Sequence, residues 1–512
     1  MSHSDRKPSI RLYIACVSAQ MGSLLLGCAL GWSGPALADM ARPDSRPHLT
    51  NDSDEDRNQK SWIGSSMTLG ALVGSIIGGL CMELIGRKKT LILLGIPNSA
   101  GYLLLCFGRQ VWLLILGRII VGMCTGVILC TVPTYIAEIS TPNIRGLLGM
   151  AFNVFGVIGI LYMDILGLWV NWNWLGLAAV VPSVLLSATM FFMPESPAWL
   201  MLKYGRTLRV VEAMHQLRDP SSDIDQELDE LEDRGTHSGS SSASKTDGQH
   251  QQQQQSSGFS IRQLSRQDVY KPLAIGLMLC LFQQFSGSNA LQFYMTDIFK
   301  DSGSTLRAEY ATIVVNCSNF LATIIGSLAI DRFGRRLLLL FSGLGHTVSL
   351  AVLGYYYYAN RNQVGGDSSA SVLPIICMVI FFVAYSIGFC PVIWIVITEI
   401  CTTAFVGFIT TTCSVFVWLC VFVVTKEFED MVQGIHKYGA YWFYGACSLL
   451  SILFVWFLPE TKGKSIDDIQ RQLYPKIYGT GSSSSSPSAH ESTINSDINN
   501  DNINRFREVS NM

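Results

Sequence analysis

Long apolar blocks, separated by short charged segments, dominate this chain of 512 residues. A helix that crosses a bilayer needs roughly 20 consecutive apolar residues. Twelve stretches meet that requirement in two groups of six: 11–31, 61–82, 90–108, 111–133, 146–168 and 173–193, then 272–298, 309–330, 337–358, 372–398, 404–424 and 438–458. No small-residue cleavage pattern follows the first block, so we interpret it as a membrane span and not as a signal peptide. The sequence therefore predicts an all-α membrane protein with twelve transmembrane helices.

Composition excludes several other classes of protein. Charged residues make up 14% of the chain, whereas soluble domains have about a quarter. The net charge of −2 gives no reason to expect a nucleic-acid partner. Most of the 14 cysteines lie inside apolar blocks without CxxC or Cys/His spacing, so we predict no disulfide framework, no metal and no cofactor. Because no His, Cys or carboxylate cluster suggests catalysis, we do not expect an enzyme.

An internal repeat relates the two groups of spans. Each group has a Gly-Arg pair after its second span, a glutamate that closes its fourth span and a glutamate after its sixth. These landmarks are Gly86-Arg87 and Gly334-Arg335, Glu138 and Glu399, and Glu195 and Glu460, at offsets of 248, 261 and 265 residues. Transporters commonly consist of two such halves, with the substrate held between them near the midplane.

The repeat divides the chain into five parts. We expect an N-terminal tail (1–10), a first six-helix bundle (11–200), a linker (201–271) with short helices and a disordered Gln/Ser-rich insert, a second six-helix bundle (272–458) and a C-terminal tail (459–512), disordered toward its end. An even number of spans places both termini on one side, and the excess of Lys and Arg there favours the cytoplasm. Asn51, in an Asn-Asp-Ser glycosylation signal, would then face outward.

Five motifs in order resemble those of the sugar porters of the major facilitator superfamily, which include facilitative glucose and trehalose transporters. They are Gly86-Arg87-Lys88, Gly117-Arg118, Pro133-Thr134-Tyr135-Ile136-Ala137-Glu138 with Arg145-Gly146, Gln283-Gln284-Phe285-Ser286-Gly287-Ser288-Asn289-Ala290, and Pro459-Glu460-Thr461-Lys462-Gly463. The resemblance covers residues 11–470 apart from the insert. It implies two pseudo-symmetric six-helix bundles in a lipid bilayer and a small neutral sugar as substrate. We expect a plasma-membrane location. Oligomeric state stays open.

A sugar presents many hydroxyl groups and no charge, so its site needs amides and aromatic faces. Gln283, Gln284 and Asn289 supply such amides in the seventh span, and the resemblance places all three in the sugar pocket. The resemblance implies further site residues: Asn319, Trp394 and Asn153 in the pocket, and Phe293 and Tyr294 closing over the sugar from outside. A lone amide can instead join two helices, and Trp394 can instead belong to the aromatic belt facing lipid.

Arg118 lies inside the fourth span, where a charge is costly and usually functional. In proton-coupled relatives the matching arginine pairs with an aspartate of the first span, and Ser33 aligns with that aspartate here. We therefore expect facilitative uniport, with Arg118 acting in gating. Asp164 is the alternative intramembrane acid. A proton-coupled symporter and a sugar sensor on a transporter scaffold remain the other hypotheses.

Charged residues at the cytoplasmic ends of the spans match a family pattern that ties the two halves together when the outside is open. The pattern comprises Arg87, Glu138, Arg145, Glu195, Arg332, Arg335, Glu399 and Glu460. Each residue alone could equally anchor the end of a helix at the interface. One departure thins the second half of this cluster: Val406 stands where an arginine is expected, seven residues after Glu399.

Overall fold

The computed structural model describes residues 8–45, 47–49, 53–219, 224–239, 267–302, 306–361, 372–401, 405–462, 464 and 469. Residues up to Lys462 belong to one compact unit, and Lys464 and Ile469 are the described residues of a second, Gly463–Met512. Asn51, most of the predicted insert and nearly all of the C-terminal tail lie outside the described residues.

The first predicted bundle consists of the expected helices. They are α1 (Ile10–Gly31) with its continuation α2 (Ser33–Met40), α3 (Asp54–Ile85), α4 (Arg87–Phe107), α5 (Val111–Ile139), α6 (Pro142–Leu166) and α7 (Trp172–Phe191). Three shorter helices follow in the linker region: α8 (Pro197–Tyr204), α9 (Leu208–Leu217) and α10 (Ile224–Gly239).

The second bundle contains two broken spans. Its helices are α11 (Gln267–Phe285), α12 (Ser288–Phe293), α13 (Met295–Asp301), α14 (Ala308–Phe333), α15 (Arg335–Ala359), α16 (Leu373–Ile387), α17 (Phe389–Ile400), α18 (Val406–Lys426) and α19 (Phe428–Trp456). Among the described residues, eleven segments are long and apolar enough to cross a membrane, and α11–α13 occupy the place of the predicted seventh span.

Glycine explains where the seventh span breaks. Gly287 adopts φ 84° between α11 and α12, a left-handed conformation that side chains disfavour. A methyl group built there would also lie 2.6 Å from the ring of Tyr444. The ring of Tyr444 therefore fits directly against the backbone at this break.

Small residues bring α3 and α5 into close contact in the first half. A methyl group built on Gly70 would lie 2.1 Å from the carbonyl oxygen of Ile119, and one on Gly126 would lie 2.1 Å from that of Ala71. Side chains at these positions would force the helices apart. Gly70, Gly74 and Gly78 on α3, and Gly122 and Gly126 on α5, recur at four-residue spacing. This spacing permits the close approach that small residues give membrane helices.

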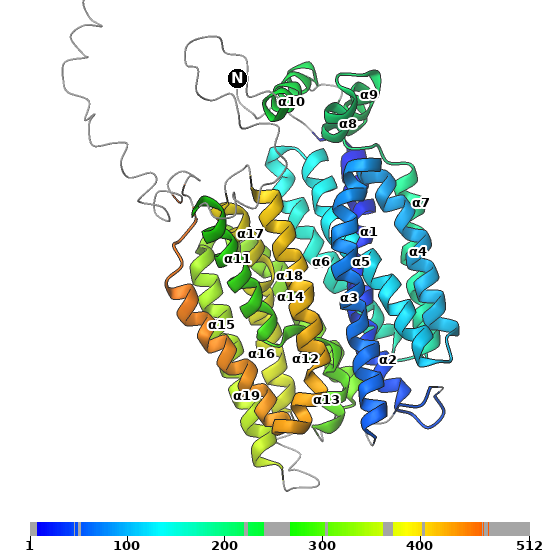
Figure 1. The fold of residues 1–512 in the computed structure, drawn as a ribbon, viewed down its shortest axis with the longest axis vertical. Helices are drawn as coiled ribbons and strands as arrows, with labels where there is room; N and C mark the ends of the chain where they lie inside the picture. The colour runs from blue at the N-terminus through cyan, green and yellow to red at the C-terminus, as the bar shows by residue number, and fades with distance from the viewer. Residues whose placement is uncertain are drawn as a thin grey trace, which may run out of the picture. The chain divides into compact units, whose positions relative to one another are not determined.

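The two ends of the spans are distinguished by the short helices (Figure 1). Helices α8, α9 and α10 group beyond one end, which we call the α8 end. There Trp199 of α8 donates its indole N–H to the Glu83 carbonyl (3.2 Å), and Arg218 pairs with Glu227 (2.7 Å). Helices α2 and α13 lie at the opposite end, which we call the α2 end.

Candidate functional site

The three predicted amides of the seventh span form one chain of hydrogen bonds. Asn289 Nδ2 donates to Gln284 Oε1 (2.6 Å), and Gln284 Nε2 donates to Gln283 Oε1 (3.2 Å). Gln283 Nε2 then donates to the backbone carbonyl of Phe389 (2.8 Å). Gln283 and Gln284 are each 3% exposed. The chain thus links α11 and α12 to the first residue of α17.

Two more predicted amides, Asn319 and Asn153, contact residues beside the junction of α16 and α17. Asn319 of α14 accepts a hydrogen bond from the hydroxyl of Ser386, and Asn153 of α6 lies 4.0 Å from the Cys390 sulfur. Ser386, Phe389 and Cys390 flank Gly388, where α16 ends and α17 begins. The break between these helices is therefore surrounded by amides from both halves of the molecule.

The predicted aromatic residues belong to α12, to its C-terminal cap and to α17. Trp394 is half-buried, on α17 beyond the break, and Phe293 is fully buried. Tyr294 donates its hydroxyl to the Thr425 carbonyl (3.3 Å) and stacks on Phe428 with ring centroids 5.1 Å apart. Tyr294 thereby ties the end of α12 to α18 and α19.

Arg118 is fully buried and is held by the first half alone. Its guanidinium donates to the carbonyls of Ala29 (2.8 Å), Ile63 (3.2 Å) and Gly64 (3.3 Å) and to the hydroxyl of Ser33 (2.7 Å). It also lies over the ring of Trp32, 5.1 Å from its centroid. These partners are all uncharged, and Ser33 occupies the position that the resemblance assigns to an aspartate in proton-coupled relatives.

Two ion pairs at the α8 end repeat the internal symmetry of the sequence. Arg87 pairs with Glu138 (2.7 Å) in the first half, and Arg335 pairs with Glu399 (2.9 Å) in the second. Each arginine is the first residue of its helix and follows a glycine with positive φ. Both pairs therefore join helices within one half.

Glu195 and Glu460 also occupy equivalent positions. Glu195 accepts the backbone N–H of Lys88 (2.9 Å), and Glu460 accepts those of Arg335 (3.0 Å) and Arg336 (3.1 Å). Each carboxylate thus binds the start of the helix that follows the Gly-Arg pair. A negative charge at a helix N-terminus is stabilising there.

The other two members of the predicted charge cluster, Arg145 and Arg332, take part in hydrogen bonds that involve backbone carbonyls. Arg145 donates to the Ser140 carbonyl (3.5 Å), and the Arg332 carbonyl accepts the Lys462 ammonium (2.7 Å). The ion pairs described at this end thus lie within the separate halves. The predicted link between the halves stays a prediction.

The described hydrogen bonds between the halves cluster at the α2 end. Ser61 of α3 donates to the carbonyl of Lys426 at the end of α18 (2.7 Å), and Lys426 donates to Asn58 (3.2 Å). Asn316 of α14 donates to Asp164 at the end of α6 (2.7 Å). These contacts hold the halves together at this end.

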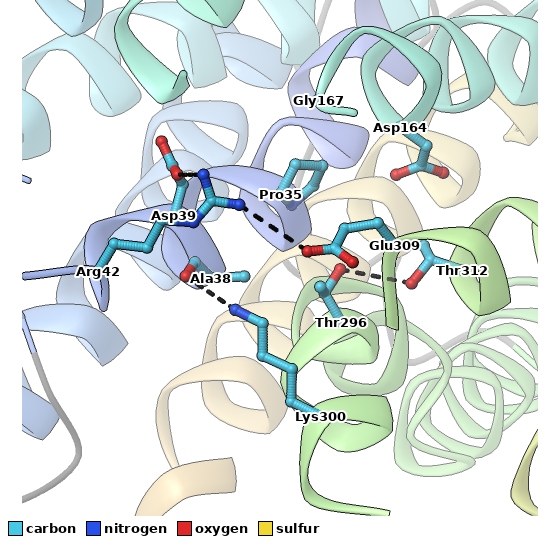
Figure 2. A pocket seen from close by; sticks show the side chains of 10 residues that line it. All are labelled: Pro35, Ala38, Asp39, Arg42, Asp164, Gly167, Thr296, Lys300, Glu309 and Thr312. Atoms are coloured by element: carbon cyan, nitrogen blue, oxygen red, sulfur yellow. Dashed lines mark hydrogen bonds and ion pairs between the residues drawn. The ribbon is translucent and has the colours of Figure 1, made fainter. Parts of the chain in front are cut away.

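A small pocket lies in the same seam, and Figure 2 shows its mixed charges. Arg42 binds Asp39 (2.9 Å) and approaches Glu309 (3.9 Å), while Lys300 donates to the Ala38 carbonyl (2.9 Å). The lining residues are Pro35, Ala38, Asp39, Arg42, Asp164, Gly167, Thr296, Lys300, Glu309 and Thr312. None of them is a predicted sugar-binding residue, so this pocket is separate from the amide assembly.

Sequence analysis did not select Ser386, Phe389 or Cys390 as site residues. The contact of Phe389 comes from its backbone carbonyl, which no side-chain motif can reveal. The usable signal was Gly388 followed by Pro391 inside an apolar span. Such Gly/Pro-interrupted segments are the best sequence indication of a binding site in transporters.

Comparisons with known proteins agree with the predicted family. A family profile described as "Sugar (and other) transporter" matches residues 15–473. The facilitated trehalose transporter Tret1 of Polypedilum vanderplanki is 34% identical over 465 residues, covering 91% of this chain and 88% of that protein. Tret1 of Drosophila yakuba is 35% identical over 491 residues, but the chain spans only about half (54%) of its length.

Solved structures are similar in fold. The proton:xylose symporter XylE bound to 6-bromo-6-deoxy-D-glucose gives a TM-score of 0.70 at 22% identity, covering 90% of this chain and 99% of that one. An inward-open structure of XylE from E. coli gives the same score, identity and coverage. These neighbours confirm the predicted twelve-helix major facilitator fold. The profile match, together with the Polypedilum relative, establishes that the chain belongs to the sugar transporter family, a family of membrane carriers and not of enzymes.

Proposed function

We propose that this protein carries a small neutral sugar, a hexose or trehalose, across a membrane by facilitative uniport. The observation that carries the proposal is the amide assembly of Gln283, Gln284 and Asn289, which meets Asn319 and Asn153 at the seam of the halves. Amides both donate and accept hydrogen bonds, as sugar hydroxyls do. The names of the Tret1 relatives support trehalose as a candidate substrate.

Arg118 supports uniport over proton coupling. Coupling through this arginine needs a group nearby that gains and loses a proton as the carrier turns over. The hydrogen-bond partners described for Arg118 are the Ser33 hydroxyl and three backbone carbonyls. None of these groups titrates in the physiological range, so Arg118 serves to fix α1, α3 and α5 together.

Proton-coupled symport is the second candidate, and Asp164 is the observation that favours it. This carboxylate is 4% exposed and accepts a hydrogen bond from Asn316 across the seam. Proton binding at Asp164 would alter a contact that holds the α2 end closed. Uptake that rises with an inward proton gradient, or a sugar-evoked current, would favour this candidate over uniport.

We further propose that the α8 end faces the cytoplasm of a plasma-membrane protein. The described contacts then represent an outer side that is closed, with Phe293 and Tyr294 in the outer gate. In the opposite state the α8-end charges would pair across the halves while the α2-end contacts separate. Alternating access requires such contacts, each holding one state and breaking in the other.

Reconstitution into liposomes tests the proposal directly. We expect saturable uptake of radiolabelled glucose, fructose or trehalose that dissipates its gradient and is independent of pH. Gln283→Ala should lower uptake at subsaturating sugar about tenfold or more, because a polar sugar site that loses a hydrogen-bond partner loses about 1–3 kcal/mol.

Gln20 provides a matched control for that variant. It is buried in α1 and donates to the Leu148 carbonyl (3.0 Å), a bond of the same kind as that from Gln283 to Phe389. Gln20→Ala should leave the affinity for sugar unchanged. Equal affinities in wild type and Gln283→Ala would remove the seventh span from the pocket, and no uptake of any sugar by folded wild-type protein would refute transport.

A further inference from the structure

The backbone between α16 and α17 leaves helical geometry at a single residue. Gly388 has φ −117° and ψ −82°. Pro391, three residues later, has no N–H that could bind the carbonyl of Ile387. The N–H of Phe389 donates instead to the hydroxyl of Ser342 on α15 (3.3 Å). A hydroxyl on α15 thus binds the first backbone donor after the break.

The break is also tightly enclosed. A methyl group built on Gly388 would lie 2.5 Å from the Leu338 carbonyl oxygen and 2.4 Å from the Ser342 Cβ. From the other side, one built on Gly326 of α14 would lie 2.8 Å from the carbonyl oxygen of Ser386. The irregular backbone therefore has no free space on its α14 and α15 sides.

His346 extends the same face of α15 by one turn, because residues four apart lie above one another on a helix. Its side chain is fully buried, and its ring stacks on Phe381 (4.4 Å between centroids, 28°) and meets Phe389 edge-on (5.1 Å, 73°). One contact precedes the break and the other follows it. These ring contacts on both sides of the break give His346 a role through its shape and aromatic face.

From these contacts we infer that Ser342 and His346 are positioning residues for the sugar site, acting through the α16–α17 break. Residues at the break bind the site amides: the Phe389 carbonyl accepts a hydrogen bond from Gln283, and the Ser386 hydroxyl donates one to Asn319. Its importance for sugar rests on the proposed function. The mechanical part, that α15 fixes the break, stands on the contacts alone.

This arrangement couples sugar binding to the break. A sugar hydroxyl that takes the Gln283 N–H replaces the Phe389 carbonyl as acceptor, and one that binds Asn319 competes with Ser386. Occupancy would therefore release two of the bonds that hold α16 and α17 to α11 and α14. Ser342 and His346 then keep the backbone between α16 and α17 in position when those bonds are released.

Hydrogen exchange measured by mass spectrometry on the full chain in nanodiscs tests the mechanical part without any sugar. Ser342→Ala should speed exchange in a peptide spanning residues 384–394 by roughly five- to tenfold, the factor for one lost hydrogen bond. Ser349→Ala is the control, because Ser349 is a buried hydroxyl of the same helix that binds the His346 carbonyl (3.1 Å). Its 384–394 peptide should exchange at the wild-type rate. Unchanged exchange in Ser342→Ala would overturn the inference.

Transport kinetics test the link to sugar. Ser342→Ala and His346→Ala should raise KM about three- to tenfold with little change in kcat, whereas His346→Phe, which keeps an aromatic ring, should retain wild-type KM. The effect of Ser342→Ala should largely disappear in a Gln283→Ala background, since residues acting through one another are not additive. Additive effects, or a His346→Phe variant as impaired as His346→Ala, would overturn the positioning role. A wild type that transports no sugar would refute the proposed function, while the exchange result would still decide whether α15 holds the break.

Discussion

Arg118 shows how one substituted partner changes what a buried charge can do. A guanidinium in the membrane interior is costly unless its donors are satisfied. Here three carbonyls and the Ser33 hydroxyl satisfy it, and Trp32 lies against its face. The residue therefore joins the α1–α2 junction to α3 and α5 without a counter-charge among those contacts.

Restoring a carboxylate at Ser33 should add the titratable group that these contacts lack. Ser33 Oγ lies 2.7 Å from Arg118 Nη2, so an aspartate at this position would meet the guanidinium directly. Burial favours the protonated acid and opposes the effect of Arg118, which favours the carboxylate. We therefore expect Ser33→Asp to make uptake depend on pH between about 5 and 8, as proton binding switches the ion pair on and off. Liposome uptake across that range checks this result.

Ser33→Asn is the control, since it adds similar volume without a proton-binding group. It should keep the flat pH profile expected of the wild type. A flat profile in folded Ser33→Asp would show that Arg118 cannot confer coupling in this scaffold. A wild-type profile that already rises toward low pH would point to Asp164 instead.

At the scale of helices, sequence predicted the spans far better than their interruptions. Each predicted block corresponds to one helix or to a run of two or three consecutive helices, because a run of about 20 apolar residues has few stable alternatives in a bilayer. Gly287 can be expected from the sequence to loosen the seventh span, but the break at Gly388 cannot be placed in advance, since glycine and proline within a span often leave it continuous. Pro133 illustrates this, because α5 runs through it unbroken.

The candidate site was predictable only in part for a related reason. Motif resemblance selected Gln283, Gln284 and Asn289, and the structure joins them in one chain of hydrogen bonds. The chain ends at the Phe389 carbonyl, which accepts the hydrogen bond from Gln283 and lies on a helix more than a hundred residues later. Which helices meet, and through which backbone atoms, depends on the packing of the whole bundle and is not encoded in any local pattern.

The carboxylate of Glu460, which binds the start of α15 at its junction with α14, should make the stability of the fold depend on pH. Burial acts to raise the pKa of Glu460, but backbone N–H donors from Lys462, Arg335, Arg336 and Thr461 together outweigh it and hold that pKa below the usual glutamate value. A lowered folded-state pKa means that the charge stabilises the fold above the unfolded pKa of about 4.3, and that this contribution is lost as pH falls through the folded pKa.

Glu460→Gln should therefore lower the melting temperature at pH 7, and the difference from wild type should shrink as the pH falls below about 4. Thermal unfolding of detergent-solubilised protein between pH 3.5 and 7 measures both. Glu427→Gln, at an exposed position, should have little effect at any of these pH values. A Glu460→Gln difference that stays constant with pH would mean that the carboxylate charge is not what secures the junction.

At the scale of the whole molecule, the two ends of the bundle differ in how the halves meet. Hydrogen bonds from Ser61, Lys426 and Asn316 cross the seam at the α2 end. The charges at the α8 end pair within each half, as Arg87 and Arg335 do. Among the described residues, the contacts between the halves at the α2 end are thus made, whereas the ion pairs at the α8 end stay within each half. This asymmetry is expected when a rocking carrier is closed at one end.

A substitution at Val406 should change the balance between the states that are closed at the α2 end and at the α8 end. Val406 is the first residue of α18 and is seven residues beyond Glu399, the spacing that separates Arg145 from Glu138. An arginine here would add a charge where we expect the halves to meet in the opposite state. A partly exposed pair contributes up to about 1 kcal/mol, so Val406→Arg should shift the population toward an open α2 end by about fivefold.

Spin labels at Glu55→Cys and Glu427→Cys, with the exposed Cys317 replaced by serine, report this shift, because α3 and α18 meet at the α2 end through Ser61 and Lys426. Pulsed electron resonance should show a larger long-distance fraction in Val406→Arg than in the unchanged background. Val406→Met, which adds length without charge, should leave the distribution unchanged. If Val406→Arg also left it unchanged, or shortened it, the charges at the α8 end would not oppose the contacts at the α2 end.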